Sequence, residues 1–329
     1  MHIFSIMHRV GSIDSYLKNL ECVAALSEKY GLTGVLLFSD NDTYFDPWVA
    51  AAELLTKTKR ISPLVAVNPI YMHPFTAAKM ISSLTQLYRR RIYLNMITGT
   101  ALSHLDAIGD RLSHDDRYLR LSEYIDILRR LLKDKRPLRY SGLYYDINDL
   151  MLPLGVPGKY MPEFFLAGRS DAALSVCMNT GSTAIRMLSS KLDSGILKTP
   201  GIHFGIVTRQ TEQQAWAGAR SLFPSCPEDL EIVLHSMQNT DSSWKNLMIQ
   251  ELEQVSSEDR NGFWLEPFAN ASADCPFLVG SYDYIAEKLN GFIERGVSTF
   301  ILDIPASEDE FFHVWSALRM SKLSSAIGL

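Results

Sequence analysis

Short apolar runs alternate along the chain with longer segments in which apolar residues recur at the spacing of a helix. The runs are rich in β-branched residues and predict strands, whereas the periodic segments predict amphipathic helices. The predicted strands are residues 3–7, 34–38, 61–68, 92–97, 164–167, 183–188, 203–208 and 299–304. The clearest helical segments are residues 16–30, 47–55, 74–87 and 116–132.

This β-α-β-α order predicts an α/β fold, a (β/α)8 TIM barrel with insertions, built as a single domain over residues 1–329. A doubly wound open sheet is the competing interpretation. Residues 189–202 contain Gly195 and Pro200, so we expect the covering helix after strand six to be shortened or missing. Residues 211–280 are too long for one crossover and predict an insertion, and residues 133–162 predict a short hairpin.

Composition and charge narrow the classes of partner. Of the 329 residues, 47% are apolar, which is enough for a large buried core. The net charge of −5 gives no positive field for a nucleic acid backbone. No apolar stretch approaches the roughly 18 residues of a membrane span, and the four cysteines lack paired spacing. We therefore expect a cytoplasmic protein that binds neither nucleic acid nor membrane.

Familiar cofactor and metal motifs are missing from the sequence. No glycine-rich dinucleotide fingerprint follows a predicted strand, and there is no Walker A loop, H-E-x-x-H motif or G-x-S-x-G elbow. The eight histidines are scattered, without the i, i+4 spacing of a helical metal site. The sequence thus predicts no metal and no nicotinamide site.

Polar residues gather where two predicted strands end. The fourth strand ends near Asn95 and Thr98, and the helix that follows opens with His114, Arg117 and Tyr118. Ordinary structural explanations stay open for this stretch, because a Thr-Gly pair often ends a strand and an acidic residue often caps a helix.

The fifth predicted strand ends in the segment Ala167-Gly168-Arg169-Ser170, which leads directly into another helix. Backbone N–H groups and the dipole at a helix start attract anions. Gly168 would let a phosphate approach the backbone, and Arg169 and Ser170 could add donors. The segment therefore predicts a phosphate site, with an ordinary helix start as the alternative.

Seven segments follow one another in a specific order: "GLTGVLLFSD", "DPWVAAAELLTKTKRISPLVAVNP", "HPFTAAKMISSLTQLYRRRIYLNMITG", "HDDRYLRLSEYIDILRRLL", "FFLAGRSDAA", "TRQTEQQAW" and "FLVGSYDYIAEKLNGFIERGVSTFIL". Together they resemble the bacterial luciferase-like flavin-dependent monooxygenases, especially the branch of alkanesulfonate monooxygenase and pyrimidine oxygenase. The resemblance implies a two-component enzyme in which an NAD(P)H-dependent flavin reductase delivers reduced FMN (FMNH2). It further implies activation of O2 as a C4a-(hydro)peroxyflavin, and a homodimer or homotetramer.

The resemblance also implies roles for individual residues. Tyr118 would reach the FMN phosphate at the segment Ala167-Gly168-Arg169-Ser170, while Asn95 and Thr98 would meet polar atoms of the flavin ring or ribityl chain. The residues expected to contact flavin or substrate during the reaction are His114, Asn68 and His203.

The chain departs from alkanesulfonate monooxygenases at their sulfonate-binding cations. Alignment places His203, Gly205 and Ala271 where that enzyme has arginine, histidine and arginine. We therefore expect a neutral or carrier-bound organic substrate and not a simple alkanesulfonate. Two other functions stay open, namely a deazaflavin-dependent oxidoreductase on the same barrel and a non-catalytic flavin-binding barrel.

Overall fold

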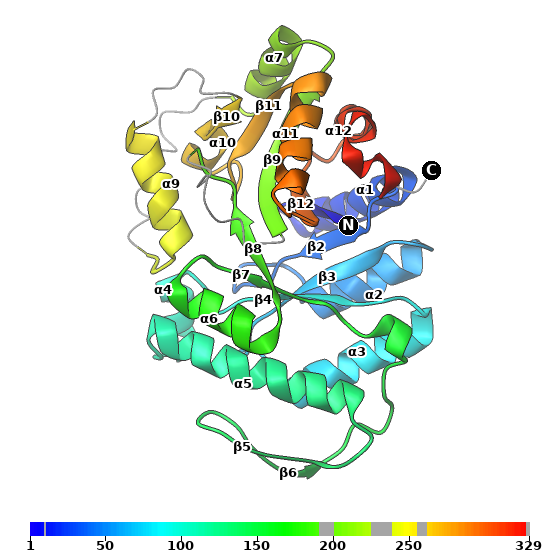
Figure 1. Ribbon diagram of the computed structural model, residues 1–329, viewed down its shortest axis with the longest axis vertical. Coiled ribbons are helices and arrows are strands. Elements are labelled where there is room, and N and C mark those ends of the chain that lie inside the picture. The colour runs from blue at the N-terminus through cyan, green and yellow to red at the C-terminus, as the bar shows by residue number, and fades with distance from the viewer. Residues whose placement is uncertain (10, 191–200, 225–238, 255–261, 327–329) are drawn as a thin grey trace. The chain divides into compact units, whose positions relative to one another are not determined.

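The main sheet of the computed structural model has ten strands, hydrogen-bonded in the order β10-β11-β9-β12-β1-β2-β3-β4-β7-β8, with an additional pairing of β8 with β9 (Figure 1). The structure describes residues 1–9, 11–190, 201–224, 239–254 and 262–326. Eight of the strands match the eight predicted runs: β1 (His2–Ile6), β2 (Gly34–Leu37), β3 (Ser62–Val67), β4 (Tyr93–Met96), β7 (Phe164–Ala167), β8 (Thr183–Met187), β9 (Gly201–Arg209) and β12 (Thr299–Asp303). This order, with β8 returning to β9, is that of a (β/α)8 barrel, and the predicted fold class is confirmed.

The chain divides into two compact units. One contains Met1–Val35 together with Ile185–Leu329, and the other contains Leu36–Ala184. We refer to them as the outer-sequence unit and the central unit, respectively.

In the central unit, parallel pairing joins β3 to β4 and β4 to β7. The helices of this unit are α2 (Pro47–Lys57), α3 (Pro74–Tyr88), α4 (Leu102–Ala107), α5 (His114–Lys133) and α6 (Asp171–Thr180), with the short 3-10 helix η1 (Gly158–Tyr160). Helix α5 packs between α3 and α6 (Figure 1). Its buried residues recur along one face, among them Leu121, Ile125 and Leu128, which is why this polar segment forms a helix that covers the sheet.

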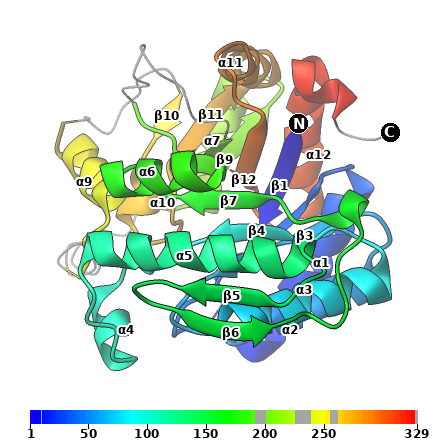
Figure 2. The ribbon, with the colours of Figure 1, turned by 60° about the horizontal axis from the view of Figure 1, so that its bottom comes forward.

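The predicted hairpin is present as β5 (Leu138–Ser141) and β6 (Asp146–Leu150), and it lies beside α5 (Figure 2). The Glu123 carboxylate on α5 accepts hydrogen bonds from the backbone N–H groups of Leu143, Tyr144 and Tyr145 at 2.7, 3.1 and 3.2 Å. A single carboxylate therefore holds the hairpin turn against the helix.

In the outer-sequence unit, β12 pairs with β1 and β9, and β9 extends far enough to pair with β11 (Phe277–Ser281) as well. Strand β10 (Phe263–Trp264) adds an antiparallel edge to β11. The helices of this unit are α1 (Ile13–Lys29), α7 (Glu212–Leu222), α9 (Ser243–Gln254), α10 (Glu266–Ala269), α11 (Tyr282–Glu294), α12 (Glu308–Met320) and the 3-10 helix η2 (Lys322–Ser325). Helix α7 begins at Thr211, whose side chain and that of Gln214 form a reciprocal capping box.

Two sequence predictions fall partly on residues outside the described ranges. The shortened covering helix was expected within 189–202, of which residues 191–200 are not described. The predicted insertion is present in part as α7, α9, β10 and α10, but residues 225–238 and 255–261 lie outside the described chain.

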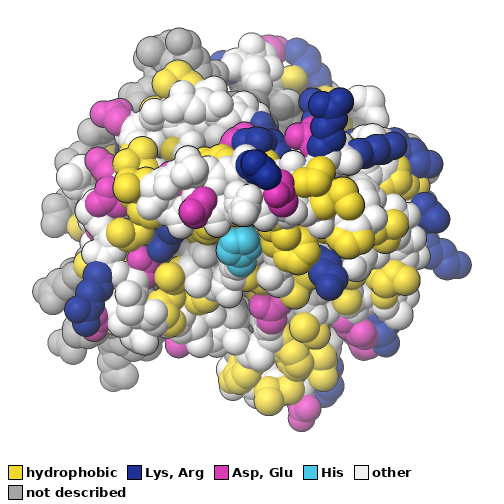
Figure 3. All heavy atoms as spheres, turned by 90° about the horizontal axis from the view of Figure 1, so that it is seen from below, with side chains coloured by type: hydrophobic (Ala, Val, Ile, Leu, Met, Phe, Trp, Pro, Cys, Tyr) yellow, Lys and Arg dark blue, Asp and Glu magenta, His cyan; other side chains and the backbone are white. Residues whose placement is uncertain are grey.

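Charged and apolar side chains are interspersed on the face of the molecule shown in Figure 3. Exposed apolar residues of the hairpin region include Leu143, Met151 and Leu154. Within the described residues, no helix is long and apolar enough to cross a membrane.

Candidate functional site

The hydroxyl group of Tyr118 is the meeting point of several residues predicted to bind the cofactor, all of them in the central unit. Tyr118 Oη donates a hydrogen bond to the carbonyl oxygen of Ala167 at 3.4 Å. Burial raises the pKa of the Tyr118 hydroxyl, while hydrogen bonds with the Thr98 and Ser170 side chains oppose that shift. The ends of β4 and β7 and the starts of α5 and α6 thus converge on one buried phenol.

Gly168 lies directly against this hydroxyl. Its φ of 151° belongs to the range that favours glycine, and a Cβ atom placed on it would stand 2.6 Å from Tyr118 Oη and 2.8 Å from Ala173 Cβ. The next-but-one residue, Ser170, caps α6, and its Oγ accepts a hydrogen bond from the Ala173 N–H at 3.2 Å. The bare backbone at Gly168 and the start of a ten-residue helix together form a cradle for an anion.

Two buried amide side chains belong to neighbouring strands: Asn68 directly follows β3, and Asn95 lies in β4. Asn95 pairs in register with Ala66 on one side and Phe165 on the other. It is 7% exposed, and its Oδ1 has no hydrogen-bond partner among the described residues. Asn68 Nδ2 lies 3.2 Å from the position that a Cβ on Gly99 would take. Because a buried, unpaired amide oxygen costs free energy, Asn95 would be stabilised by a ligand that donates to it.

His114 and Arg169 complete the set of predicted cofactor residues. The His114 and Tyr118 rings have their centroids 5.0 Å apart, and His114 Nδ1 lies 2.6 Å from Asp115 Oδ1. Arg169, between Gly168 and Ser170, is partly exposed. The structure therefore brings the His114 ring next to the Tyr118 ring.

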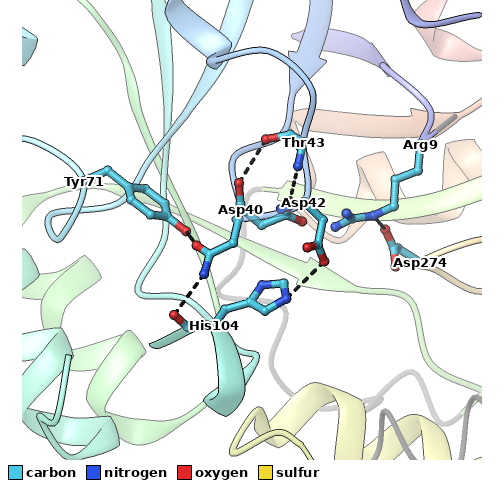
Figure 4. Close-up of polar contacts among 8 residues, drawn as sticks. Arg9, Asp40, Asp42, Thr43, Tyr71, His104 and Asp274 are labelled. Atoms are coloured by element: carbon cyan, nitrogen blue, oxygen red, sulfur yellow. Dashed lines mark hydrogen bonds and ion pairs between the residues drawn. The ribbon is translucent and has the colours of Figure 1, made fainter. Parts of the chain in front are cut away.

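A polar network ties together three loops that follow β2, β3 and β4 in the central unit (Figure 4). Asn41 Oδ1 accepts a hydrogen bond from Tyr71 Oη at 2.7 Å, and Asn41 Nδ2 donates to the carbonyl oxygen of His104 at 3.0 Å. The His104 side chain in turn contacts Asp42, with 3.0 Å between Nε2 and Oδ2. Asp40 closes its own turn by accepting from the Thr43 N–H at 2.9 Å. These contacts fix the loops at the carboxyl ends of the strands, where barrel enzymes carry their sites.

The outer-sequence unit contains the three positions that differ from alkanesulfonate monooxygenases. His203 in β9 is 8% exposed, and burial lowers its pKa, although the charges of Asp303 and Asp274 oppose that shift. Gly205 faces the Phe277 ring so closely that a Cβ would lie 2.3 Å from the ring. Ala271 is exposed, in a turn with φ of 57°. The Phe277 ring thus occupies the space that a histidine would need at position 205.

Two of the charged pairs that the sequence pattern did not reveal lie near the ends of the barrel strands or their loops. In the central unit, Arg120 donates to both carboxylate oxygens of the buried Asp110, at 3.1 and 2.5 Å, which holds the loop after α4 against α5. In the outer-sequence unit, His8 Nε2 lies 2.8 Å from Asp303 Oδ1. The signal for the second pair was the position of each residue at the end of a predicted strand, β1 and β12, which neighbour each other in a closed barrel.

The cluster at Tyr118 has the chemistry to hold a flavin mononucleotide. The cradle at Gly168 fits a phosphate, and the unpaired Asn95 oxygen fits a donor on the ring or ribityl chain. Among the described residues, no group of three or more His, Cys, Asp or Glu side chains is arranged to hold a metal ion.

The fold and this site can now be compared with those of known protein families. The model of the luciferase-like monooxygenase family matches residues 2–191, and the chain belongs to that family. It is 33% identical over 309 residues to 4-(gamma-L-glutamylamino)butanoyl-[BtrI acyl-carrier protein] monooxygenase BtrO of Niallia circulans, which covers 91% of this chain and 89% of the relative. The resemblance noted in the sequence is thereby confirmed, and the chain is a flavin-dependent monooxygenase by family.

Solved structures share the fold over the full length. The oxygenating constituent of 3,6-diketocamphane monooxygenase from Pseudomonas putida, in complex with FMN, superimposes with a TM-score of 0.69 at 16% identity, covering 100% of this chain and 99% of that chain. An F420-dependent secondary alcohol dehydrogenase superimposes with a TM-score of 0.65 at 14% identity, with the same two coverages of 100% and 99%. The fold therefore accommodates both a flavin and a deazaflavin.

Proposed function

We propose that the protein is a two-component monooxygenase that uses FMNH2 and O2 to oxygenate a neutral or carrier-bound organic substrate. The observation that carries this proposal is the convergence of Thr98, Ala167 and Ser170 on the Tyr118 hydroxyl, beside the bare backbone of Gly168. Four chain segments meet there at the start of α6, and the backbone N–H groups of a helix start attract a phosphate.

In this proposal, the cradle from Ala167 to Ser170 and the Tyr118 hydroxyl hold the FMN phosphate, while Asn95 and Thr98 bond to polar atoms of the cofactor. His114 lies next to Tyr118 and, with Asn68, borders the reacting part of the site. When bound, reduced FMN supplies two electrons to O2, so that one oxygen atom can be transferred to the substrate. The residues of the chain then serve mainly to bind, orient and exclude water.

The relative BtrO carries an acyl-carrier-protein substrate in its name, and this supports a thioester-bound acyl chain as the substrate class here. The replacement of cationic residues by Gly205 and Ala271 also favours a substrate without a sulfonate, because a buried anion without a cationic partner is poorly stabilised. His203 would contact the substrate. A separate NAD(P)H-dependent reductase and a homodimer or homotetramer complete the proposal.

The test is an anaerobic titration with FMNH2 followed by rapid mixing with oxygen. We expect reduced FMN to bind more tightly than oxidised FMN, and a transient flavin absorbance to precede the return of oxidised FMN. With a flavin reductase and 4-(gamma-L-glutamylamino)butanoyl groups loaded on an acyl-carrier protein, mass spectrometry should detect the addition of one oxygen atom.

A deazaflavin-dependent dehydrogenase is the second candidate, supported by the shared fold of the F420-dependent enzyme. The same protein titrated with reduced deazaflavin separates the two functions. Tight binding of the deazaflavin, hydride transfer to a carbonyl probe and indifference to oxygen would replace our proposal with this second one.

A further inference from the structure

A histidine and an aspartate form a hydrogen-bonded pair where β1 and β12 end, within the outer-sequence unit. His8 Nε2 lies 2.8 Å from Asp303 Oδ1, and the two side chains are 22% and 6% exposed. Because a carboxylate only accepts hydrogen bonds, Nε2 carries the proton and Nδ1 is the free nitrogen of the neutral ring. His8 Nδ1 is itself buried and has no partner among the described residues.

A second imidazole, His203, lies on the same face of the sheet. Asp303 pairs in register with Gly205 of β9, and His203 is two residues before Gly205, so the two side chains leave the sheet on one side. His203 Nε2 is also buried without a partner among the described residues. A buried nitrogen without a hydrogen-bond partner costs free energy, so each of the two would be stabilised by a ligand.

Among the described residues, further polar and charged groups near the pair come from the segment before β11 and from the residue after His8. Cys275 Sγ lies 3.8 Å from Asp303 Oδ2, and Arg9 Nε donates to Asp274 Oδ2 at 3.0 Å. Burial lowers the pKa of His8, but the charge and hydrogen bond of Asp303 outweigh burial, and the pKa lies above its ordinary value. Burial raises the pKa of the Cys275 thiol well above its ordinary value, with the Asp303 and Asp274 charges adding to the rise, so this thiol stays protonated.

We propose that His8 is a catalytic base that takes a proton from the carbon next to the carbonyl of a thioester-bound acyl chain, with Asp303 as its positioning residue. The proposal rests on the proposed function. In this proposal, His203 Nε2 donates a hydrogen bond to the thioester carbonyl oxygen. Negative charge develops on that oxygen as the proton leaves the neighbouring carbon. The arrangement of an imidazole between a carboxylate and a reacting atom is that of a carboxylate-oriented general base.

The choice of carbon follows from the chemistry of the substrate class. A saturated acyl thioester has its most acidic C–H bonds beside the carbonyl, and loss of one such proton leaves an electron-rich carbon that can accept an oxygen atom. The C–H bond breaks, its proton passes to His8 Nδ1, and a C–O bond forms with one atom of O2. The second oxygen atom leaves as water, which takes up the proton from His8, while FMNH2 is oxidised to FMN.

The test uses hydrogen exchange and needs no oxygen. The FMN-bound protein is incubated anaerobically in heavy water with 4-(gamma-L-glutamylamino)butanoyl pantetheine, and mass spectrometry follows deuterium at the carbon next to the carbonyl. We expect the protein to accelerate exchange, and both His8→Ala and His8→Gln to lower the rate by about 100-fold or more. Added imidazole should restore part of the rate in His8→Ala, where it has space to bind, but not in His8→Gln.

The positioning role of Asp303 has its own readout. Asp303→Asn should lower the exchange rate and move the rising limb of its pH profile to lower pH, because His8 loses the carboxylate that holds its pKa up. Asp303→Glu should recover part of the rate. His313→Gln is a matched control, since His313 bonds the Tyr282 hydroxyl at 2.5 Å on the helices of the same unit and should leave exchange unchanged.

Two results would overturn the inference: no acceleration of exchange by the wild-type protein, or a wild-type rate in both His8 variants. Flavin binding and oxidation of FMNH2 by O2 are measured separately on each variant. If exchange is fast but FMNH2 does not bind, the proposed function fails and the base assignment stands. If FMNH2 binds and reacts with O2 but exchange is absent, the base assignment fails alone.

Discussion

Tyr118 and Gly168 are packed so closely that a methyl group on Gly168 would stand 2.6 Å from the tyrosine hydroxyl. The φ of Gly168 adds backbone strain for any other residue. Gly168→Ala should therefore destabilise the protein by about 1 to 3 kcal/mol and weaken FMN binding at least tenfold, as measured by thermal unfolding and flavin fluorescence. Gly158→Ala is the control, because nothing lies within 4 Å of its added Cβ. Equal FMN affinity in the two variants would place the phosphate elsewhere.

The double variant Arg169→Ala with Ser170→Ala tests the donors of the cradle. Each charge-assisted bond to phosphate that is lost should cost about 1.5 to 3 kcal/mol of FMN binding. Ser170→Ala also removes a helix cap, which alone costs about 0.5 to 2 kcal/mol of stability. Ser281→Ala separates the two effects, since Ser281 caps α11 in the same way and lies outside the central unit. That control should lower the unfolding temperature and leave FMN affinity intact.

Tyr118→Phe removes the hydroxyl at which Thr98, Ala167 and Ser170 meet. We expect weaker FMN binding and partial loss of stability, because three polar groups lose a buried partner. Tyr124→Phe is the comparison, since the Tyr124 hydroxyl is buried without a partner among the described residues and its removal should be neutral or stabilising. Calorimetric titration measures the FMN affinity of both variants. A larger loss of affinity in Tyr124→Phe would contradict the site.

The two histidines around Asp303 should give the stability opposite dependences on pH. The lowered pKa of His203 means that the folded state binds fewer protons than the unfolded state, so its contribution is complete above about 6.5 and is lost as pH falls from there through its folded value. The raised pKa of His8 gives a contribution that is complete below about 6.5 and lost as pH rises through its folded value. The free energy of unfolding in urea is measured across this pH range for the wild-type protein, His203→Gln and His8→Gln. Each variant should lose the pH dependence that its missing histidine contributes and keep the other. Parallel pH curves for wild type and both variants would refute these shifts.

Short alkanesulfonates should be neither bound nor desulfonated. The Phe277 ring fills the space beside Gly205, and the nearby cation Arg209 is already paired, with 3.0 Å between Nη1 and Glu310 Oε2. A buried sulfonate would therefore lack a cationic partner. The assay is sulfite release from a panel of sulfonates, supplied with FMNH2 by a flavin reductase. Efficient release from any of them would show that another cation binds the sulfonate.

The strands were predictable because each is a short apolar run, and the observed bounds differ from the predicted ones by at most two residues. The search for apolar runs missed β11, because its five residues open the segment "FLVGSYDYIAEKLNGFIERGVSTFIL" and were not recognised as a separate strand. The residues around Tyr118 were predictable as a group from their order along the chain, yet the contact of Tyr118 with Gly168 depends on how two helix starts meet. His8 and Asp303 are separated by 295 residues, so only the pairing of β1 with β12 brings them together.

The Asn41 side chain uses both ends of its amide, one on the Tyr71 hydroxyl and the other on the His104 backbone (Figure 4). Displacement of either partner loop must therefore break its bond to Asn41, and displacement of the Asn41 loop must break both bonds. Such a connection makes local opening cooperative, and the backbone amides of residues 40–43, 68–73 and 101–107 should exchange with solvent at a common rate. Entry to this side of the site would then depend on one shared fluctuation. The single change Asn41→Ala would release residues 68–73 from it, while the contact between His104 and Asp42 would still link the other two loops.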